Sequence, residues 1–152
     1  MSESGKATRK KVLAAMSGGV DSSVAAMLLC EAGFDVTGMT MCLGLRAEAG
    51  RASCCGGDAV EDARHVCGQL GITHFVFDFS QLMESLVIEK FIDEYFLGRT
   101  PNPCVDCNRY LKFGALLDKA RAMGFDYLAT GHYARIEAVD DVWKLLRSRD
   151  KV

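Results

Sequence analysis

The sequence predicts an α/β fold in which an open parallel sheet carries helices on both faces. Short apolar runs typical of buried strands alternate with longer segments whose apolar residues recur at helical spacing. Parallel strands need crossover connections, which helices normally supply. A glycine-rich stretch directly follows the first strand, where sheets of this kind bind their ligands. At 152 residues the chain fits one domain with a single sizeable core.

Four strands are predicted for the sheet and two more for a hairpin. The sheet strands are residues 11–16, 35–43, 73–79 and 125–130. The hairpin pairs residues 133–138 with residues 142–146 around Asp140 and Asp141. Residues 44–57 mix Gly, Ser, Arg and Cys without a period, and we expect a loop there.

Four helices are predicted between these strands. The first covers residues 22–32, with Gly33 as its stop and a buried face formed by Val24, Leu28 and Ala32. The second begins at the cap Asp58 and ends at Gly71, and its inward positions are Val60, Ala63, Leu70 and either Val66 or Cys67. The third begins at Ser80 and carries Leu82, Leu86, Phe91 and Tyr95 on one face. The prolines of the turn at residues 98–103 end it, and the fourth helix covers residues 108–123.

The composition of the chain argues against a strongly basic, a secreted or a membrane-spanning protein. The net charge of −2 gives no whole-chain field that attracts nucleic acid, so any RNA contact has to be local. The basic leader at residues 1–10 lacks the apolar stretch of a signal peptide, and no apolar run approaches the roughly 20 residues of a membrane span. We therefore expect a cytoplasmic protein without a membrane partner. Seven cysteines, an odd number, without an export signal predict reduced thiols.

The stretch MSGGVDSS, residues 16–23, predicts a phosphate cradle. Gly18 and Gly19 permit positive φ and close approach of the backbone to a ligand. The amides of residues 19–22 can point at an anion, and the start of a helix near Ser22 adds partial positive charge. The stretch is not a Walker loop, which requires GxxxxGK[ST]. The alternative is a plain glycine turn in which Asp21 or Ser22 caps the helix.

Cys104 and Cys107 form a CxxC at the start of the fourth predicted helix. A thiol at a helix N-terminus near Arg99, Arg109 and Lys112 is expected to have a lowered pKa and to be a good nucleophile. The same spacing also suits a metal, although it supplies two of the four ligands that zinc needs, and the loop carrying Cys54 and Cys55 is a candidate source of others. A structural loop is the third interpretation of this CxxC.

Four motifs together resemble a known enzyme family. SGGVDSS alone resembles the PP-loop of the ATP pyrophosphatases, which split ATP between its α and β phosphates. Combined with GRTPNPCVDCNRYLKF, CCGGDAVEDARHVC and ATGHYARI, it resembles the N-terminal part of the tRNA-specific 2-thiouridylases over residues 11–150. The resemblance implies a Rossmann-like domain of the adenine nucleotide alpha hydrolase type. It also implies that ATP adenylates the C2 oxygen of the wobble uridine, position 34, and that a persulfide sulfur replaces this oxygen.

The resemblance assigns roles residue by residue. Residues on the nucleotide would be Met41, Gly131 and the loop positions Ala15, Met16, Ser17, Gly18, Gly19, Val20, Asp21 and Ser22. Asn102, Pro103 and Cys104 would face the target base, and His132 would meet the tRNA. Cys107 would be the nucleophile that carries the sulfur. Mg²⁺ would neutralise the phosphates, and no residue is assigned to a protein-bound metal.

Partners and domain organisation follow from the same resemblance. The substrates would be the Lys, Glu and Gln tRNAs, and a sulfur-carrier protein or cysteine desulfurase would deliver the persulfide. An iron–sulfur cluster through Cys104 and Cys107 is the alternative use of the two thiols. Residues 1–10 would be a leader and residues 11–152 the ATP-binding catalytic domain, without the central and C-terminal domains of the family. We expect such a fragment to bind ATP without completing thiolation. The other candidates are a PP-loop enzyme acting on a small molecule and a cysteine-rich metal-binding module.

Overall fold

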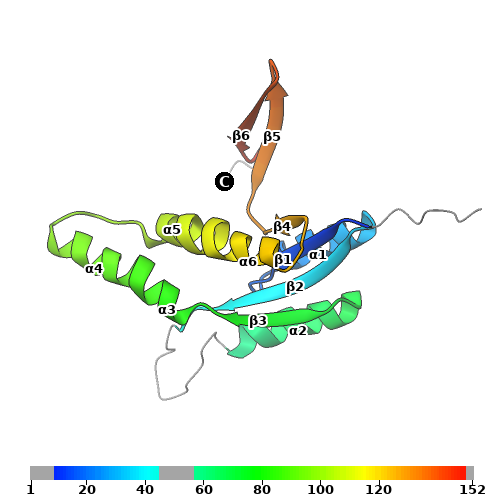
Figure 1. Cartoon of the computed structure of the whole chain (residues 1–152), viewed down its shortest axis with the longest axis horizontal. Coiled ribbons are helices and arrows are strands. Elements are labelled where there is room, and N and C mark those ends of the chain that lie inside the picture. Colours follow the sequence, from blue (N-terminus) through cyan, green and yellow to red (C-terminus); the bar gives the residue numbers. More distant parts are fainter. Residues whose placement is uncertain (1–8, 45–56, 150–152) are drawn as a thin grey trace, which may run out of the picture.

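Four parallel strands form the central sheet, in the order β3-β2-β1-β4 (Figure 1). The computed structural model describes residues 9–44 and 57–149. The strands are β1 (Lys11–Ala15), β2 (Asp35–Cys42), β3 (His74–Asp78) and β4 (Tyr127–Ala129). The predicted parallel sheet is confirmed, and each strand is one to three residues shorter than predicted. Because β1 lies between β2 and β4, the chain leaves it toward one side of the sheet and returns on the other.

Helices cover both faces of this sheet (Figure 1). One face packs against α1 (Val20–Glu31) and α2 (Gly57–Leu70). The opposite face packs against two long helical arms. The first arm is α3 (Ser80–Met83), the π-helical segment η1 (Glu84–Ile88) and α4 (Glu89–Phe96). The second is α5 (Pro103–Asp106), the π-helical segment η2 (Cys107–Leu116) and α6 (Leu117–Ala122).

Each face has its own apolar cluster. The cluster under α1 and α2 contains Ala14, Met16, Ala26, Val36, Ala63 and Cys67, and Leu70 packs against it. The inward face predicted for α2 is therefore confirmed except at Val60, which is not part of the cluster. The cluster under the two arms contains Leu13, Met39, Phe79, Met83, Val87, Leu111, Leu116 and Ala120. Neighbouring residues of one strand, such as Leu13 and Ala14, therefore serve opposite layers, as strand alternation requires.

The buried face predicted for α1 is wrong. Val24 and Leu28 are 42% and 54% exposed, whereas Ser22 and Ala26 are buried. Apolar residues occur on several sides of this helix, so their spacing did not identify the inward one. The helix begins at Val20 instead of Ser22, and small residues at its inward positions let it lie close to the sheet.

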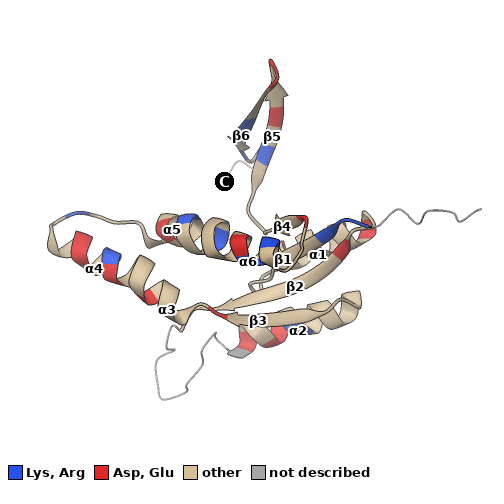
Figure 2. Ribbon diagram, in the orientation of Figure 1, with Lys and Arg blue, Asp and Glu red and all other residues tan. Residues whose placement is uncertain are grey.

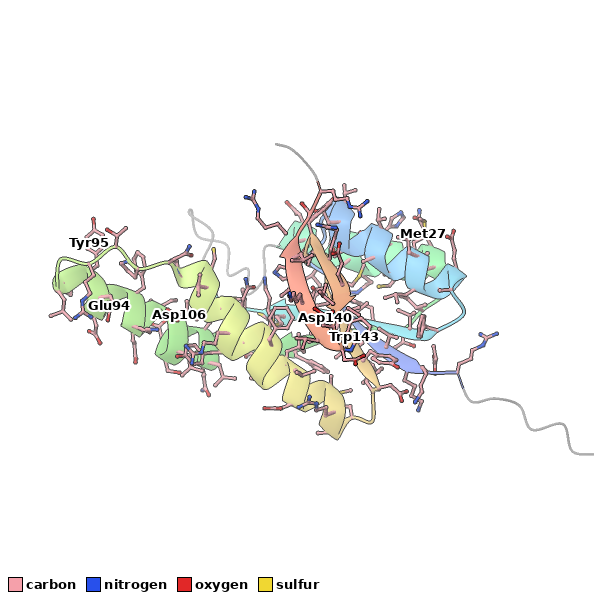
Figure 3. The ribbon with its side chains drawn as sticks, turned by 90° about the horizontal axis from the view of Figure 1, so that it is seen from above. Met27, Glu94, Tyr95, Asp106, Asp140 and Trp143 are labelled. Carbon is pink, nitrogen blue, oxygen red and sulfur yellow. The ribbon has the colours of Figure 1, made fainter. Side chains whose placement is uncertain are left out.

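The face predicted for the first arm is also wrong. Met83 and Val87 are buried, while Leu82 and Leu86 are exposed and Tyr95 is 66% exposed. The π-helical segment η1 bonds each residue one position further along than an α-helix does, which rotates the inward face. No residue of α4 is buried. Figure 3 shows Glu94 and Tyr95 near the far end of this arm.

The second arm begins five residues before the position predicted from the sequence. Asn102 is its N-cap, and Asn102 Oδ1 accepts a hydrogen bond of 3.0 Å from the Cys104 amide. Pro103 occupies the first turn, where its missing N–H costs nothing and its fixed φ suits a helix. The Asn-Pro pair is thus a start signal, and Cys104 and Cys107 both lie inside the helix.

The hairpin prediction is confirmed to within one residue at each end. Strands β5 (Ala134–Val139) and β6 (Val142–Arg147) pair antiparallel, and Asp140 and Asp141 form the turn with φ of 51° and 62°. Positive φ at both central residues is the geometry of a type I′ turn, which suits a two-residue hairpin. The hairpin stands apart from the parallel sheet (Figure 1), with Asp140 and Trp143 on it (Figure 3).

The cysteines only partly match the expectation of reduced thiols. Cys30, Cys67, Cys104 and Cys107 are free, and Cys67 is a buried core residue. Cys42 is disulfide-bonded, contrary to that expectation. Cys54, Cys55 and most of the predicted loop and leader lie outside the described residues.

The described residues carry charges of both signs. Acidic and basic residues are interspersed along α4, α6 and the hairpin (Figure 2). Within residues 9–44 and 57–149, the structure contains no helix with the length and apolar character needed to cross a bilayer.

A glycine in the middle of β2 should be essential for stability. A Cβ added at Gly38 would lie 2.4 Å from Cys67 Sγ, beneath α2, so we expect Gly38→Ala to destabilise the fold by about 1–3 kcal/mol. Gly68→Ala is the matched control, since nothing lies within 4 Å of its added Cβ and alanine favours the helix by about 0.5–1 kcal/mol. Urea denaturation followed by far-ultraviolet circular dichroism measures both. Equal stability of the two variants would contradict the packing described for β2 and α2.

Candidate functional site

A cavity of about 590 Å³ opens where β1, β2 and β4 end. It lies where the strand order diverges from β1, which is the usual ligand position in open α/β sheets. The segment after β1, the end of β2, the start of α2, the segment η2 and the chain after β4 all contribute to it. Its lining residues are Ala15, Met16, Ser17, Asp21, Ser22, Met39, Thr40, Met41, Leu43, Ala59, Cys107, Lys112, Thr130, Gly131 and His132.

Two serine hydroxyls hold the turn between β1 and α1. The Gly19 amide donates to Ser17 Oγ at 3.3 Å, and Ser22 Oγ donates to the Gly19 carbonyl at 3.0 Å. The two hydroxyl oxygens lie 3.2 Å apart, so Ser17 donates to Ser22 and a ring of hydrogen bonds closes. The Ser17 amide also donates to Ser22 Oγ, at 3.2 Å. This ring, the Ser17–Gly19–Ser22 ring, fixes the backbone at the start of α1.

The two glycines of the turn differ in backbone conformation. Gly18 has a φ of +79°, and an added Cβ would lie 2.5 Å from the carbonyl oxygen of Ala59 in α2. Gly19 does not use the positive φ that a glycine permits, since it is extended at φ −85° and is the N-cap of α1. No side chain caps this helix, so the alternative of an Asp21 or Ser22 cap is wrong. The first-turn amides of α1 have no partner within the helix and remain the anion-binding groups expected for a cradle.

A buried threonine connects this turn to β2 and β3. Thr40 Oγ1 donates to the Met16 carbonyl at 2.9 Å, and it lies 2.9 Å from His74 Nε2. Because the hydroxyl has one proton, His74 Nε2 is the donor in the second contact. His74 Nδ1 is then an acceptor, and it is buried without a partner in the described part of the chain. Burial and the nearby Arg64 lower the pKa of His74.

The chain after β4 closes the cavity against the N-terminus of α1. An added Cβ at Gly131 would lie 2.7 Å from the Ser22 backbone nitrogen, so only glycine permits this approach. The Tyr133 hydroxyl donates to Asp21 Oδ1 at 2.9 Å. His132 Nδ1 lies 2.8 Å from Thr130 Oγ1. Burial and, to a smaller extent, the charge of Lys112 lower the pKa of His132, which keeps its imidazole neutral at pH 7.

The segment η2 brings a thiol and an amine to the same cavity. Cys107 and Lys112 are five residues apart, and both line the cavity. Five residues in an α-helix, at 3.6 per turn, would place them about 140° apart. The i→i+5 hydrogen bonds of a π-helix return the fifth residue to nearly the same side. Helical periodicity at 3.6 residues therefore fails to show that these two side chains share a site.

The lowered pKa expected for Cys107 is wrong. Burial raises the pKa of this thiol, the charge of Lys112 opposes the rise, and Cys104 adds to it. The two arginines that we expected to help are engaged elsewhere. Arg99 forms an ion pair with Glu94 at 2.9 Å, and the Arg109 guanidinium lies 5.3 Å from the centroid of the Tyr110 ring.

The cavity includes most of the residues that the sequence assigned to a nucleotide. Ala15, Met16, Ser17, Asp21, Ser22, Met41 and Gly131 line it, together with His132 and Cys107. The other assigned residues lie outside the lining: Gly18, Gly19, Val20, Asn102, Pro103 and Cys104. Sequence reasoning missed Met39, Thr40, Leu43, Ala59, Lys112 and Thr130 as lining residues. Leu43 was recognisable because it ends a predicted parallel strand, where ligand sites form.

The described residues do not form a metal centre. Within residues 9–44 and 57–149 there is no group of three or more His, Cys, Asp or Glu side chains that could hold a metal ion. An iron–sulfur cluster typically uses four thiolates, and this part of the helix supplies the two thiols of Cys104 and Cys107.

Sequence comparisons link the chain to tRNA-modifying proteins. The family described as the tRNA methyl transferase HUP domain matches residues 10–152. A tRNA-specific 2-thiouridylase MnmA 1 from Syntrophus aciditrophicus is 63% identical over 144 residues, which is 95% of this chain and 39% of that protein. A tRNA-specific 2-thiouridylase MnmA from Clostridium botulinum is 54% identical over 94% of this chain and 40% of its own length. The chain therefore spans about two fifths of these relatives.

Comparisons with solved structures support the fold. A protein described as a predicted subunit of tRNA methyltransferase from Methanocaldococcus jannaschii superposes with a TM-score of 0.54 at 20% identity, covering 82% of this chain and 53% of the other. A glutamine-dependent NAD⁺ synthetase from Acinetobacter baumannii, solved with adenosine diphosphate, gives a TM-score of 0.52 at 18% identity, covering 80% and 21%.

The stability of the chain should depend on pH through His74. Because the pKa of His74 is lower in the folded chain than the usual 6.5, its contribution is complete above about pH 6.5 and is lost as the pH falls toward the lowered value. We expect His74→Gln, which keeps an N–H donor for Thr40, to lose less stability than the parent chain between about pH 7.5 and pH 5. Urea midpoints at each pH measure this difference. Parallel losses in the two proteins would show that His74 does not titrate as described.

Proposed function

The chain belongs to the tRNA methyl transferase HUP domain family, and on this premise we propose that it is the ATP-binding catalytic domain of a tRNA-uridine 2-sulfurtransferase. The observation that carries the proposal is a single cavity that contains both an anion cradle and a thiol. Ser17, Asp21 and Ser22 line it from the turn after β1, and Cys107 lines it from η2. The 2-thiouridylases among the relatives carry the same reaction in their names.

The proposed reaction has three steps. The uridine C2 oxygen attacks the α-phosphorus of ATP, and pyrophosphate leaves with the bonding electron pair. The terminal sulfur of a persulfide on Cys107 then attacks C2, and the C2–oxygen bond breaks as AMP leaves with that oxygen. A second thiol finally attacks Cys107 Sγ, the S–S bond breaks with its electron pair moving to the sulfur on C2, and a disulfide to Cys107 remains. The turn at residues 16–19 and the first amides of α1 bind the phosphates. Thr40 supports this role because its hydroxyl holds the Met16 carbonyl at the start of the turn.

The Cys107 thiol by itself is a poor sulfur donor, because burial raises its pKa. Burial keeps the resting thiol protonated near neutral pH, so it is a weak nucleophile by itself. We infer that a sulfur-carrier protein or cysteine desulfurase loads Cys107 before the uridine arrives. His132, which is neutral and exposed at the rim of the cavity, would meet the tRNA, and Asn102, Pro103 and Cys104 would face the target base. The substrates would be the Lys, Glu and Gln tRNAs.

Mg²⁺ fits the cavity better than an iron–sulfur cluster does. Asp21 places a carboxylate beside the cradle, and Mg²⁺ typically binds one or two carboxylates together with phosphate oxygens. The ion would neutralise negative charge on the triphosphate. The described residues do not complete a cluster site, so no step of the proposed reaction uses one.

Nucleotide affinity should depend on the Ser17–Gly19–Ser22 ring. We expect Ser22→Ala to weaken binding of a nonhydrolysable ATP analogue with Mg²⁺ by about 2- to 10-fold, the value of one or two hydrogen bonds. Ser23→Ala is the matched control, since Ser23 Oγ donates to the same Gly19 carbonyl at 2.9 Å but does not contact Ser17. Asp21→Ala should also weaken binding of the ATP analogue. Tyr133→Phe is the comparison for this variant, because it removes the hydroxyl that donates to Asp21 and keeps the Asp21 carboxylate.

Isothermal titration calorimetry measures these affinities. If the folded parent chain bound no ATP analogue, the proposed ATP-binding domain would be wrong, and metal analysis of anaerobically purified protein would then test the metal-binding alternative. Turnover of ATP with a small acid in the absence of RNA would instead support another PP-loop enzyme.

Formation of 2-thiouridine should depend on Cys107 more than on Cys104. In the full-length enzyme we expect Cys107→Ser to abolish formation of 2-thiouridine in tRNA while ATP binding persists, because the serine cannot carry a persulfide. Cys104→Ser is the comparison, since Cys104 is exposed and does not line the cavity. Mass spectrometry of nucleosides from the treated tRNA provides the readout. Normal thiolation by Cys107→Ser would remove this residue from the reaction.

A further inference from the structure

The cavity contains a lysine whose charge no carboxylate balances. Among the described lining residues, Lys112 carries the one cationic side chain at neutral pH and Asp21 the one carboxylate. Asp21 Oδ1 already accepts the hydroxyl of Tyr133. In the described part of the chain, Lys112 forms no ion pair within 4 Å, no hydrogen bond and no aromatic contact.

Two other lysines on the helical arms have a partner for their charge. Lys90 pairs with Asp106 at 2.7 Å, and Lys119 lies 4.4 Å from the centroid of the Phe77 ring. Lys112 is half-buried and has neither kind of partner. A cation held in a concave, partly desolvated position is stabilised most when an anion enters beside it.

Two other residues that line the cavity, Cys107 and His132, lie close to Lys112. Its charge lowers the pKa of His132 and opposes the burial that raises the pKa of Cys107. Lys112 lines the same cavity as Cys107 and His132, and the ring of Phe113, the next residue of η2, lies 5.6 Å from the His132 ring. The π-helical segment η2 is what turns Cys107 and Lys112 to the same side.

We propose that Lys112 is a catalytic residue that binds the phosphoryl group of the adenylated substrate and of the AMP that leaves. This inference rests on the proposed function. When sulfur forms its bond to C2, the C2–oxygen bond breaks and the electron pair moves onto the oxygen of AMP. The Lys112 ammonium stabilises that added negative charge next to Cys107. The cradle at the start of α1 is left for the pyrophosphate, so the two anionic products have separate binding groups.

The experiment compares AMP with adenosine, which lacks the phosphoryl group, and with inorganic pyrophosphate, which lacks the nucleoside. We expect Lys112→Met, which keeps most of the side-chain stem, to weaken AMP binding by about 10- to 100-fold, the loss of a hydrogen bond to a charged group. Adenosine, which has no phosphoryl group, and inorganic pyrophosphate should bind within about twofold of the parent chain. Lys112→Arg should retain most of the AMP affinity. Lys119→Met is the matched control on the same arm and should leave all three affinities unchanged.

A second readout does not depend on any ligand. Nuclear magnetic resonance titration of the imidazole should show the pKa of His132 rising in Lys112→Met and staying constant in Lys119→Met. A constant pKa of His132 in Lys112→Met would overturn the placement of the charge. Unchanged AMP affinity, or parallel loss of adenosine affinity, would overturn the role as a phosphoryl ligand. If the parent chain bound neither AMP nor the ATP analogue, the proposed function itself would fail.

Discussion

The site depends on how the chain leaves the central strand. Four residues separate β1 from α1, and the Ser17–Gly19–Ser22 ring holds their backbone in one conformation. Ser22 has to be buried to complete the ring, and this sets the rotation of α1 about its axis. Ala26 then faces the sheet while Val24 and Leu28 face outward. The polar contacts of one side chain thus determine which apolar residues of α1 enter the core.

The same turn also positions the other walls of the cavity. The positive φ of Gly18 brings the backbone against Ala59 at the start of α2, and the missing side chain of Gly131 lets the segment after β4 reach Ser22. Thr40 ties the turn to β2 through the Met16 carbonyl. Three segments far apart in the sequence therefore meet at the amides that begin α1. The fourth wall is independent of them, because the π-helical geometry of η2 selects its residues.

Local patterns allowed much of this arrangement to be predicted. Alternating apolar runs predicted the parallel sheet, and the turn residues Asp140 and Asp141 predicted the hairpin. Strand ends and glycines identified most of the cradle. The inward face of the first arm was not predictable, since it depends on a π-helical segment that a 3.6-residue period cannot describe. The sequence placed Lys112 near the CxxC thiols, but a 3.6-residue period does not show that Lys112 and Cys107 line the same cavity. The pKa of Cys107 was misjudged because its direction depends on burial, which sequence neighbours do not show.

The isolated hairpin has a consequence for the spectroscopy of this chain. The single tryptophan of the chain, Trp143, is 74% exposed and lies on β6, in the hairpin that stands apart from the parallel sheet (Figure 1). A two-stranded hairpin is marginally stable by itself, so it can open while the parallel sheet stays folded. Tryptophan fluorescence would then follow the hairpin, and circular dichroism would follow the layered domain. Transitions that do not coincide would reflect these two parts, rather than a folding intermediate of the sheet.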